Sequence, residues 1–362
     1  MTSLFDPLTL RSGAVLKSRF VLSPLTNLQS HPDGVLSDDE FRWLTMRAEG
    51  GFALTMTCAA SVQEEGVGFP GQLGFHDDKH LPGLTRLAAK IKEYGSHAVG
   101  QLHHGGLRAL KNAKAPSDDE KLKAQAMTLD EIEHSRDCFI RAAQRAERAG
   151  FDGVELHGAH GYLICSFLSQ ELNRRDDAYG GDPERRMRFL LECIDGTRAA
   201  TKPGFSLGVR LSPERWGLVV SEIADVAQFL MRDRKVDYID MSLWDVKKEP
   251  QEERFQGRTL ASYFTELDRG DTRLGAAGKI MSAQDCRDVI EMGFDFPILG
   301  RAAILHHDFP KRMAADPNFT SIPTPVSEAY LRNEGLGPAF VEYMRTWKGF
   351  VEDAASAPRG IL

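Results

Sequence analysis

The stretch TLDEIEHSRDCFIRAAQRAERAGFDGVELHGA, residues 128–159, contains one helix pattern followed directly by one strand pattern. Thr128 and Glu131 form the capping-box pattern that starts a helix, and Gly150 stands where a glycine commonly ends one. The apolar run 153–159 is short and mostly not alternating, as is typical of a strand buried on both faces of a parallel sheet. The stretch therefore predicts one helix–strand unit of an α/β protein.

The same pattern recurs along the chain, with amphipathic stretches between short apolar runs. The further strands that we expect are 19–26, 52–59, 98–104, 206–212, 237–243, 273–280 and 296–301. Two more helix starts support this reading: Ser37 with Glu40 forms a second capping-box pattern, and Asp182 precedes a first-turn proline.

Eight strand–helix units in one chain predict a single (β/α)₈ barrel, which we place at residues 1–351 with a tail at 352–362. A doubly wound sheet is the alternative. It is disfavoured because residues 23–26, SPLT, stand where such a sheet carries a glycine-rich phosphate turn, and no GxGxxG occurs in the chain.

Composition excludes several classes of protein. With 42% hydrophobic residues the 362-residue chain can bury a large core, and a formal charge of −7 argues against coating nucleic acid or an anionic membrane. No apolar run reaches the roughly 20 residues of a membrane span. The start, MTSLFDPLTLRSG, lacks a secretory pattern, and the five cysteines are scattered and never spaced as CxxC. We therefore expect a cytoplasmic protein with a small-molecule substrate and no metal, nucleic acid or membrane partner.

Polar residues gather at the ends of the predicted strands, which meet at one mouth of a barrel and form its active site. Two long segments, 105–127 and 244–262, follow the third and sixth strands and are expected to roof this mouth. The strand-end residues are Thr26, Ala59, Gln101, His103, His104, His157, His160, Arg210, Ser242, Trp244, Gly278, Gly300 and Arg301.

Each strand-end group has a functional and a structural interpretation. Gly278, Gly300 and Arg301 would bind a phosphate through backbone N–H groups and a guanidinium, or form tight turns beside a surface arginine. Arg210 ends a buried strand, so it needs either an anionic ligand or an ion pair with a barrel carboxylate. The amide of Gln101 would read the edge of a heterocycle or tie two loops together.

His157 and His160 are three residues apart, just past the fourth predicted strand. They would bind a metal, donate hydrogen bonds to a substrate oxygen, or be one core and one loop histidine. Tyr162 follows two residues later, and its phenol would donate a proton to a substrate carbon or serve only in packing.

Seven segments in one order resemble the Old Yellow Enzyme family of flavin-dependent ene-reductases. The most specific is ELHGAHGYLICSFLSQELNRRDDAYGGDPERRMRF, residues 155–189. The others are LFDPLTL, LKSRFVLSPLTN, GQLHHGGL, VRLSP, AAGKI and ILGRA, and together they cover the chain from residue 4 to about residue 310.

The resemblance implies a noncovalent flavin mononucleotide (FMN) at the barrel mouth, with NAD(P)H as a transient reductant. By position, the isoalloxazine would be held by Pro24, Thr26, Ala59, Gln101, His157 and Arg210, and the phosphate by Gly278, Gly300 and Arg301. His157 and His160 would bind the carbonyl of an activated alkene, and Tyr162 would protonate its α-carbon.

Three departures from the family pattern concern the substrate and the assembly. Leu28, assigned to the substrate site, stands where some members have tyrosine, and Leu107 stands where the family has arginine, although Arg108 follows directly. The segment GLGPAFVEYMRTWKGF does not clearly match the one that, in some relatives, sends an arginine into a neighbouring subunit. A homodimer or homotetramer is expected from the family.

Three alternative functions were weighed. Larger flavin-dependent relatives cleave C–N bonds or reduce dienoyl thioesters, but they carry a cysteine cluster and further nucleotide-binding domains that this sequence lacks. A metal-dependent hydrolase would use the histidines as ligands. A catalytically idle flavin-binding protein would bind the cofactor without reacting.

Overall fold

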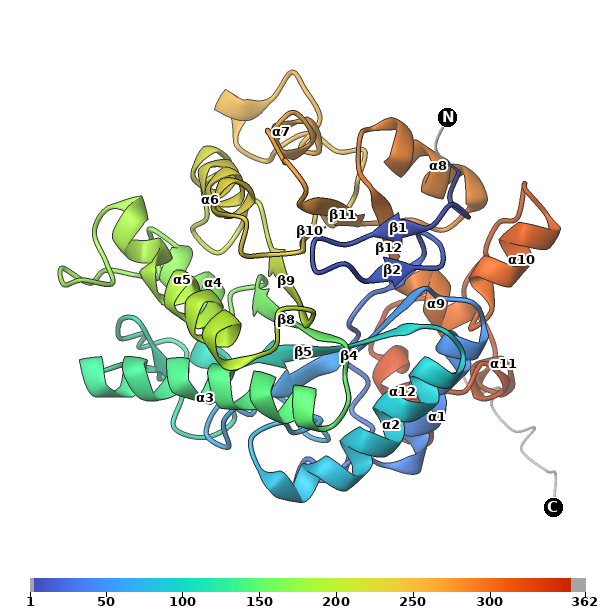
Figure 1. The fold of residues 1–362 in the computed structure, drawn as a ribbon, viewed down its shortest axis with the longest axis horizontal. Helices are drawn as coiled ribbons and strands as arrows, with labels where there is room; N and C mark the ends of the chain where they lie inside the picture. Colours follow the sequence, from blue (N-terminus) through green and yellow to red (C-terminus); the bar gives the residue numbers. More distant parts are fainter. Residues whose placement is uncertain (1–2, 353–362) are drawn as a thin grey trace, which may run out of the picture.

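Eight parallel strands close into a barrel at the centre of the molecule (Figure 1). The computed structural model describes residues 3–352. Around the barrel the strands follow chain order, β3, β4, β5, β8, β9, β10, β11, β12, and the last strand, β12, pairs with the first, β3, to close the ring. Their bounds are β3 Val21–Leu22, β4 Leu54–Ser61, β5 His97–His103, β8 Gly153–Gly158, β9 Ser206–Leu211, β10 Tyr238–Ser242, β11 Arg273–Ala277 and β12 Phe296–Leu299.

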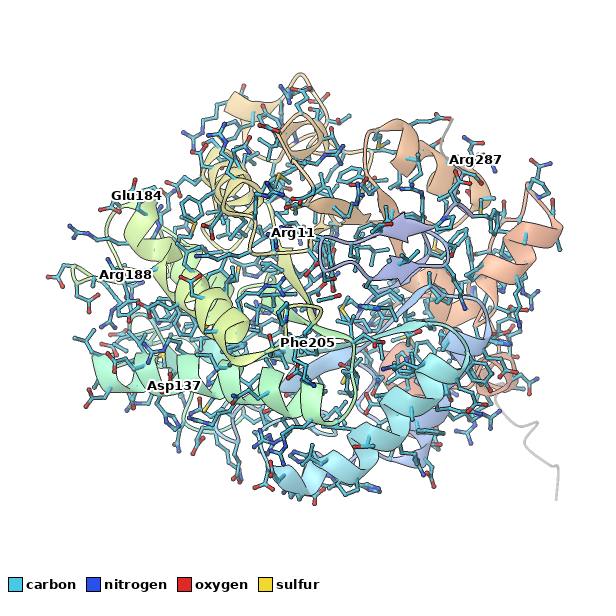
Figure 2. All side chains as sticks on the ribbon, viewed as in Figure 1. Arg11, Asp137, Glu184, Arg188, Phe205 and Arg287 are labelled. Carbon is cyan, nitrogen blue, oxygen red and sulfur yellow. The ribbon has the colours of Figure 1, made fainter. Side chains whose placement is uncertain are left out.

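Helices surround the strands and turn one face of each toward them. In α5 the inward side chains of Phe189 and Leu190 are buried, whereas Glu184 and Arg188 project into solvent (Figure 2). The helices are α1 Asp38–Glu49, α2 Leu81–Glu93, α3 Leu129–Arg148, α4 Leu163–Leu168, α5 Pro183–Ala200, α6 Val220–Asp233, α7 Ser262–Thr265, α8 Ala283–Glu291, α9 Arg301–Leu305, α10 Phe309–Ala315, α11 Glu328–Asn333 and α12 Pro338–Arg345. No helix in residues 3–352 has the length and apolar character needed to cross a membrane.

The predicted barrel and its eight strands are confirmed, and so are most of the predicted helix ends. Thr128 and Glu131 form a complete capping box, and Gly150 follows α3 with φ of 87°. The expected box at Ser37 is only half right. The Ser37 hydroxyl accepts the Glu40 amide, but the Glu40 carboxylate is buried and accepts hydrogen bonds from Asn27 and Ser30 instead.

The two ends of the barrel differ. A hairpin of β1 (Leu8–Thr9) and β2 (Val15–Leu16) closes the amino end, where its leucines join the buried cluster of Leu54 and Phe296. The carboxyl end carries the long segments. Residues 105–127 contain the 3₁₀ turn η2 Gly106–Arg108 and the short pair β6 Lys114–Ala115 and β7 Gln125–Ala126, and the later segment contains η3 Glu253–Phe255. The predicted tail lies, apart from Glu352, outside the described residues.

Candidate active site

A cavity of about 690 Å³ opens at the carboxyl ends of the barrel strands, within the size range of sites that hold cofactors. Its lining comes from all eight βα segments and from α12. The lining residues are Ser23, Pro24, Leu25, Thr26, Ala59, Gln101, Arg108, His157, His160, Tyr162, Arg210, Trp216, Ser242, Trp244, Ala277, Gly278, Lys279, Ile280, Ile298, Gly300, Arg301, Ile304, Tyr343, Met344 and Trp347.

The cavity brings together most of the residues assigned from the sequence. The expected cofactor and catalytic residues all line it: Pro24, Thr26, Ala59, Gln101, His157, His160, Tyr162, Arg210, Gly278, Gly300 and Arg301. Leu28 is not among the lining residues. It has a left-handed backbone, with φ of 58°, and its carbonyl faces Gly71 rather than the cavity.

One side of the cavity suits an anionic group. Gly300 follows β12, and a Cβ built there would make ordinary van der Waals contacts with Leu25 at 3.6 Å and Ser23 at 3.9 Å, so packing does not require glycine at this position. Arg301 begins α9 at this point and is exposed. Gly278 is different, because a Cβ there would lie 2.8 Å from the amide nitrogen of Asp245. Glycine at 278 is thus needed for packing.

Buried polar residues form the floor of the cavity. The Arg210 Nε lies 3.1 Å from an Asp240 carboxylate oxygen, so the predicted ion pair with a barrel carboxylate is present even though Arg210 also faces the cavity. Gln101 donates its amide N–H to Glu155 at 2.7 Å, which leaves its carbonyl oxygen without a partner in the described chain. Burial raises the pKa of Glu155 to about 8 and that of Asp240 to about 6.

The two candidate histidines are neutral. Burial, followed by the neighbouring His160, His103 and Arg210, holds the pKa of His157 well below its usual value. The backbone amide of Ala159 donates to His157 Nδ1 at 3.3 Å, so the proton of the neutral ring is on Nε2. His157 therefore offers one N–H donor.

His160 is positioned by a short hydrogen-bond chain. Arg210 donates to the Ser242 hydroxyl at 3.4 Å, and that hydroxyl lies 2.8 Å from His160 Nε2. A hydroxyl can donate one hydrogen bond and accept two, so this contact holds the His160 ring in place with Nε2 as either donor or acceptor. His160 has φ of 61°, and its amide is held by the Ser212 hydroxyl at 3.1 Å. Such strained backbone is typical of functional sites.

Tyr162 stands between three other side chains at the start of α4. Its ring packs edge-on against His103, with centroids 4.3 Å apart, and against His157 at 5.2 Å. The guanidinium carbon of Arg108 lies 5.3 Å from the same ring. His103 and His104 are buried and do not line the cavity, and burial lowers their pKa values to about 3 and about 4.

Sequence reasoning missed one wall of the cavity. Tyr343, Met344 and Trp347 come from α12 and the turn after it, where no motif is present. Phe340 of the same helix packs edge-on against Trp43 of α1, with ring centroids 4.9 Å apart, and this contact carries α12 across the mouth. The apolar periodicity of residues 338–345 could have indicated a packed helix, but not the surface that it covers.

Comparison with known proteins agrees with this geometry. Residues 3–318 match the NADH:flavin oxidoreductase / NADH oxidase family. The chain belongs to this family. It is 36% identical over 333 residues to the probable NADH-dependent flavin oxidoreductase YqiG of Bacillus subtilis, covering 88% of this chain and 86% of that one. It is 34% identical over 335 residues to an NADPH dehydrogenase of Bacillus pumilus, covering 90% and 97%.

Solved structures of the family have the same barrel. An Old Yellow Enzyme from a Pichia species superposes with a TM-score of 0.77 at 25% identity, over 91% of this chain and 90% of that one. Morphinone reductase in complex with tetrahydroNAD gives the same score and identity, over 95% and 96%. The protein is thus an NAD(P)H-dependent flavin oxidoreductase of the Old Yellow Enzyme type, and the resemblance found in the sequence is confirmed.

Proposed function

We propose that this protein binds FMN at the barrel mouth and reduces alkenes that are activated by a carbonyl or similar group. One observation carries the proposal: a single cavity is lined by an exposed arginine beside Gly300, by the buried Arg210 in its floor and by two neutral histidines beside a tyrosine. The flavin would supply hydride transfer from reduced nicotinamide to the β-carbon of the alkene.

The described residues fit FMN. Arg301 and the backbone at Gly300 would hold the phosphate, and the unpartnered Gln101 oxygen would accept a hydrogen bond from an N–H of a flat heterocycle. Arg210 would face the pyrimidine edge and stabilise the negative charge of the reduced ring. Pro24, Thr26 and Ala59 would complete the pocket for the isoalloxazine.

The histidine pair would hold the substrate oxygen. His157 would offer its Nε2–H and His160 its free ring N–H, and burial lowers the pKa of both rings so that they stay neutral. Neutral donors orient a carbonyl without giving it a full proton. Hydrogen bonds of this kind become stronger as the oxygen gains charge during hydride arrival.

Tyr162 would deliver the proton that completes the reduction. The phenol hydroxyl of Tyr162 is a hydrogen-bond donor and lies at the cavity wall beside His157. NAD(P)H and the alkene would occupy the cavity in turn, so we expect ping-pong kinetics. A solved structure of the similar morphinone reductase is a complex with tetrahydroNAD, which supports nicotinamide binding in this family.

Anaerobic spectroscopy tests this function. The purified protein should be yellow, NADH or NADPH should bleach it, and an enone should restore the colour. Colourless protein that cannot be reconstituted with FMN would overturn cofactor binding. A bleached protein that no enone, maleimide or nitroalkene reoxidises would leave only an NAD(P)H-oxidising flavoprotein.

The hydrolase alternative lacks a suitable ligand set. In the part of the chain that the structure describes, the one group of three side chains with metal-binding geometry is His307, Asp308 and Glu334. None of these residues lines the cavity. A chelator should therefore leave the reductase activity unchanged.

A further inference from the structure

The cavity is strongly cationic in a protein whose net charge is −7. Arg108, Arg210, Lys279 and Arg301 line it, and no aspartate or glutamate of residues 3–352 does. A cleft lined by charges of one sign concentrates ligands of the other sign. The charge pattern therefore points to anionic ligands.

Two of these cations are already paired and two are not. Arg210 contacts Asp240 at 3.1 Å, and Lys279 contacts Asp245 at 2.8 Å. Neither Arg108 nor Arg301 has a carboxylate of the described chain within 4.0 Å. The proposed FMN phosphate accounts for Arg301, but it leaves Arg108 without an anion.

Arg108 stands far from the phosphate side. Arg301 follows β12 and Arg108 follows β5, and two strands, β3 and β4, separate these in the closed barrel. One phosphate at Arg301 therefore does not account for both arginines. Arg108 is instead beside the proposed chemistry, with its guanidinium carbon 5.3 Å from the ring centroid of Tyr162.

The backbone fixes this position. The Arg108 amide donates to Gly105 at 3.0 Å, which closes the η2 turn. Gly106 has φ of 57°, and a Cβ there would lie 2.8 Å from the amide nitrogen of Leu163, the first residue of α4. Only glycine allows η2 to pack this closely against the helix that Tyr162 precedes.

We infer that Arg108 binds a carboxylate of the substrate, so that the preferred alkenes are unsaturated carbonyl compounds that also carry an acid group. The inference rests on the proposed function. His157 and His160 would hold the carbonyl while the planar guanidinium pairs with the carboxylate. A phosphate of the nicotinamide dinucleotide is the other possible source of the anion, and the test distinguishes the two.

Equilibrium binding of two matched phenols to the holoenzyme provides the test. Phenols mimic an enolate, and 4-hydroxyphenylacetate differs from 4-methylphenol by one carboxylate. Binding is followed by the flavin absorbance band and by calorimetry in wild type, Arg108→Met and Arg108→Lys. Arg215→Met is the control, because Arg215 is another arginine near the mouth, stacked over Trp244 at 4.6 Å and outside the lining.

Arg108→Met should weaken the binding of 4-hydroxyphenylacetate by about 10-fold. This is the lower end of the range for a charge-assisted hydrogen bond, because Arg108 is exposed. The affinity for 4-methylphenol should stay within about twofold. Arg108→Lys should recover part of the loss. Added salt should weaken the binding of 4-hydroxyphenylacetate to the wild-type protein, and it should weaken binding to Arg108→Met much less. Arg215→Met should behave as wild type.

Three results would overturn the inference. An equal loss for both phenols would mean that Arg108 only packs against Tyr162. Unchanged acid binding with weaker NADPH or NADH binding would assign the anion to the nucleotide. Absence of a preference for the acid in wild type would also contradict it. A protein that never binds flavin would overturn the proposed function instead, and calorimetry would still show whether Arg108 binds the acid.

Discussion

Buried carboxylates at the two ends of this barrel differ in how completely they are hydrogen-bonded. At the amino end, Asp237 accepts hydrogen bonds from the amides of Ser12 and Leu207 at 2.5 and 2.8 Å and from Arg198 at 2.6 Å. Below the mouth, one oxygen of Asp240 and one of Glu155 lack a partner in the described chain, and the other Asp240 oxygen is ion-paired with the Arg210 Nε at 3.1 Å but makes no hydrogen bond.

This difference separates stability from function. Saturated carboxylates such as Asp237 tie neighbouring strands and the closing hairpin together. Asp295 repeats the arrangement, since it accepts the Leu274 amide at 2.9 Å. At the mouth, unpartnered polar atoms and strained residues such as His160 cost stability, and they are tolerated where a ligand would use them. Substitutions at the amino end should therefore lower stability and leave the flavin chemistry unchanged, whereas substitutions at the mouth should impair the chemistry.

The largest effect is expected at Tyr162. Tyr162→Phe should slow reoxidation of the flavin by an enone by about 10²–10⁴-fold and leave its reduction by NAD(P)H nearly unchanged, because only the second half-reaction needs the proton. Stopped-flow measurement of each half-reaction checks this. Equal slowing of both would show that Tyr162 merely packs the site. No slowing of either would mean that water or another residue supplies the proton.

Asp237→Ala tests the opposite end. Removing this carboxylate leaves Arg198 and two backbone amides without their acceptor, so unfolding should become easier by about 3–5 kcal/mol. Denaturant unfolding measures this change in the free energy of unfolding. Flavin reduction and reoxidation rates per folded molecule should match wild type. A variant that folds normally but loses its flavin chemistry would contradict the claim that the amino end serves stability and the mouth serves function.

Glu155→Gln should change how stability depends on pH. Burial raises the Glu155 pKa from 4.5 to about 8 in the folded protein, so its stabilising contribution is complete below pH 4.5 and is lost as pH rises through 8. Glutamine does not titrate. The variant should gain on wild type as pH rises from 5 to 8.5, on the order of 2 kcal/mol or about 4 °C in melting temperature. Parallel melting curves across this range would contradict a buried, protonated Glu155.

A smaller effect is expected at Ser242. Ser242→Ala removes the hydroxyl between Arg210 and His160, so the His160 ring loses the hydrogen-bond partner that holds it in place. Phenol binding should weaken by about 5-fold, the value of one ordinary hydrogen bond. Ser242→Thr keeps a hydroxyl and should recover much of the affinity. Identical affinities in all three proteins would show that Ser242 does not position His160.

Local patterns made the barrel and one half of the site predictable. Each strand is a short apolar run and some helices have their own start signals, so Thr128 and Asp182 could be identified without tertiary contacts. Parallel strands bring their carboxyl ends to one mouth, which is why Gln101 and Arg301 could be placed in one cavity from their positions alone.

The remainder depends on contacts between distant segments. Asp240 becomes important only because β10 lies beside β9 and meets Arg210 there. Trp347 reaches the cavity only because α12 packs on α1. Glu40 carries a capping-box signal, yet two buried polar residues far from the helix start attract its carboxylate. No local pattern encodes these partners.

Titration of the apoprotein with FMN tests the central claim, that the mouth is the flavin site, most directly. Quenching of flavin fluorescence gives the dissociation constant for wild type, Arg301→Ala and the control Arg287→Ala, whose arginine lies on the outer surface and bonds the Pro317 carbonyl (Figure 2). Arg301→Ala should bind FMN about 10–100-fold more weakly, and Arg287→Ala should equal wild type. Unchanged affinity in Arg301→Ala, or an equal loss in both variants, would contradict the account.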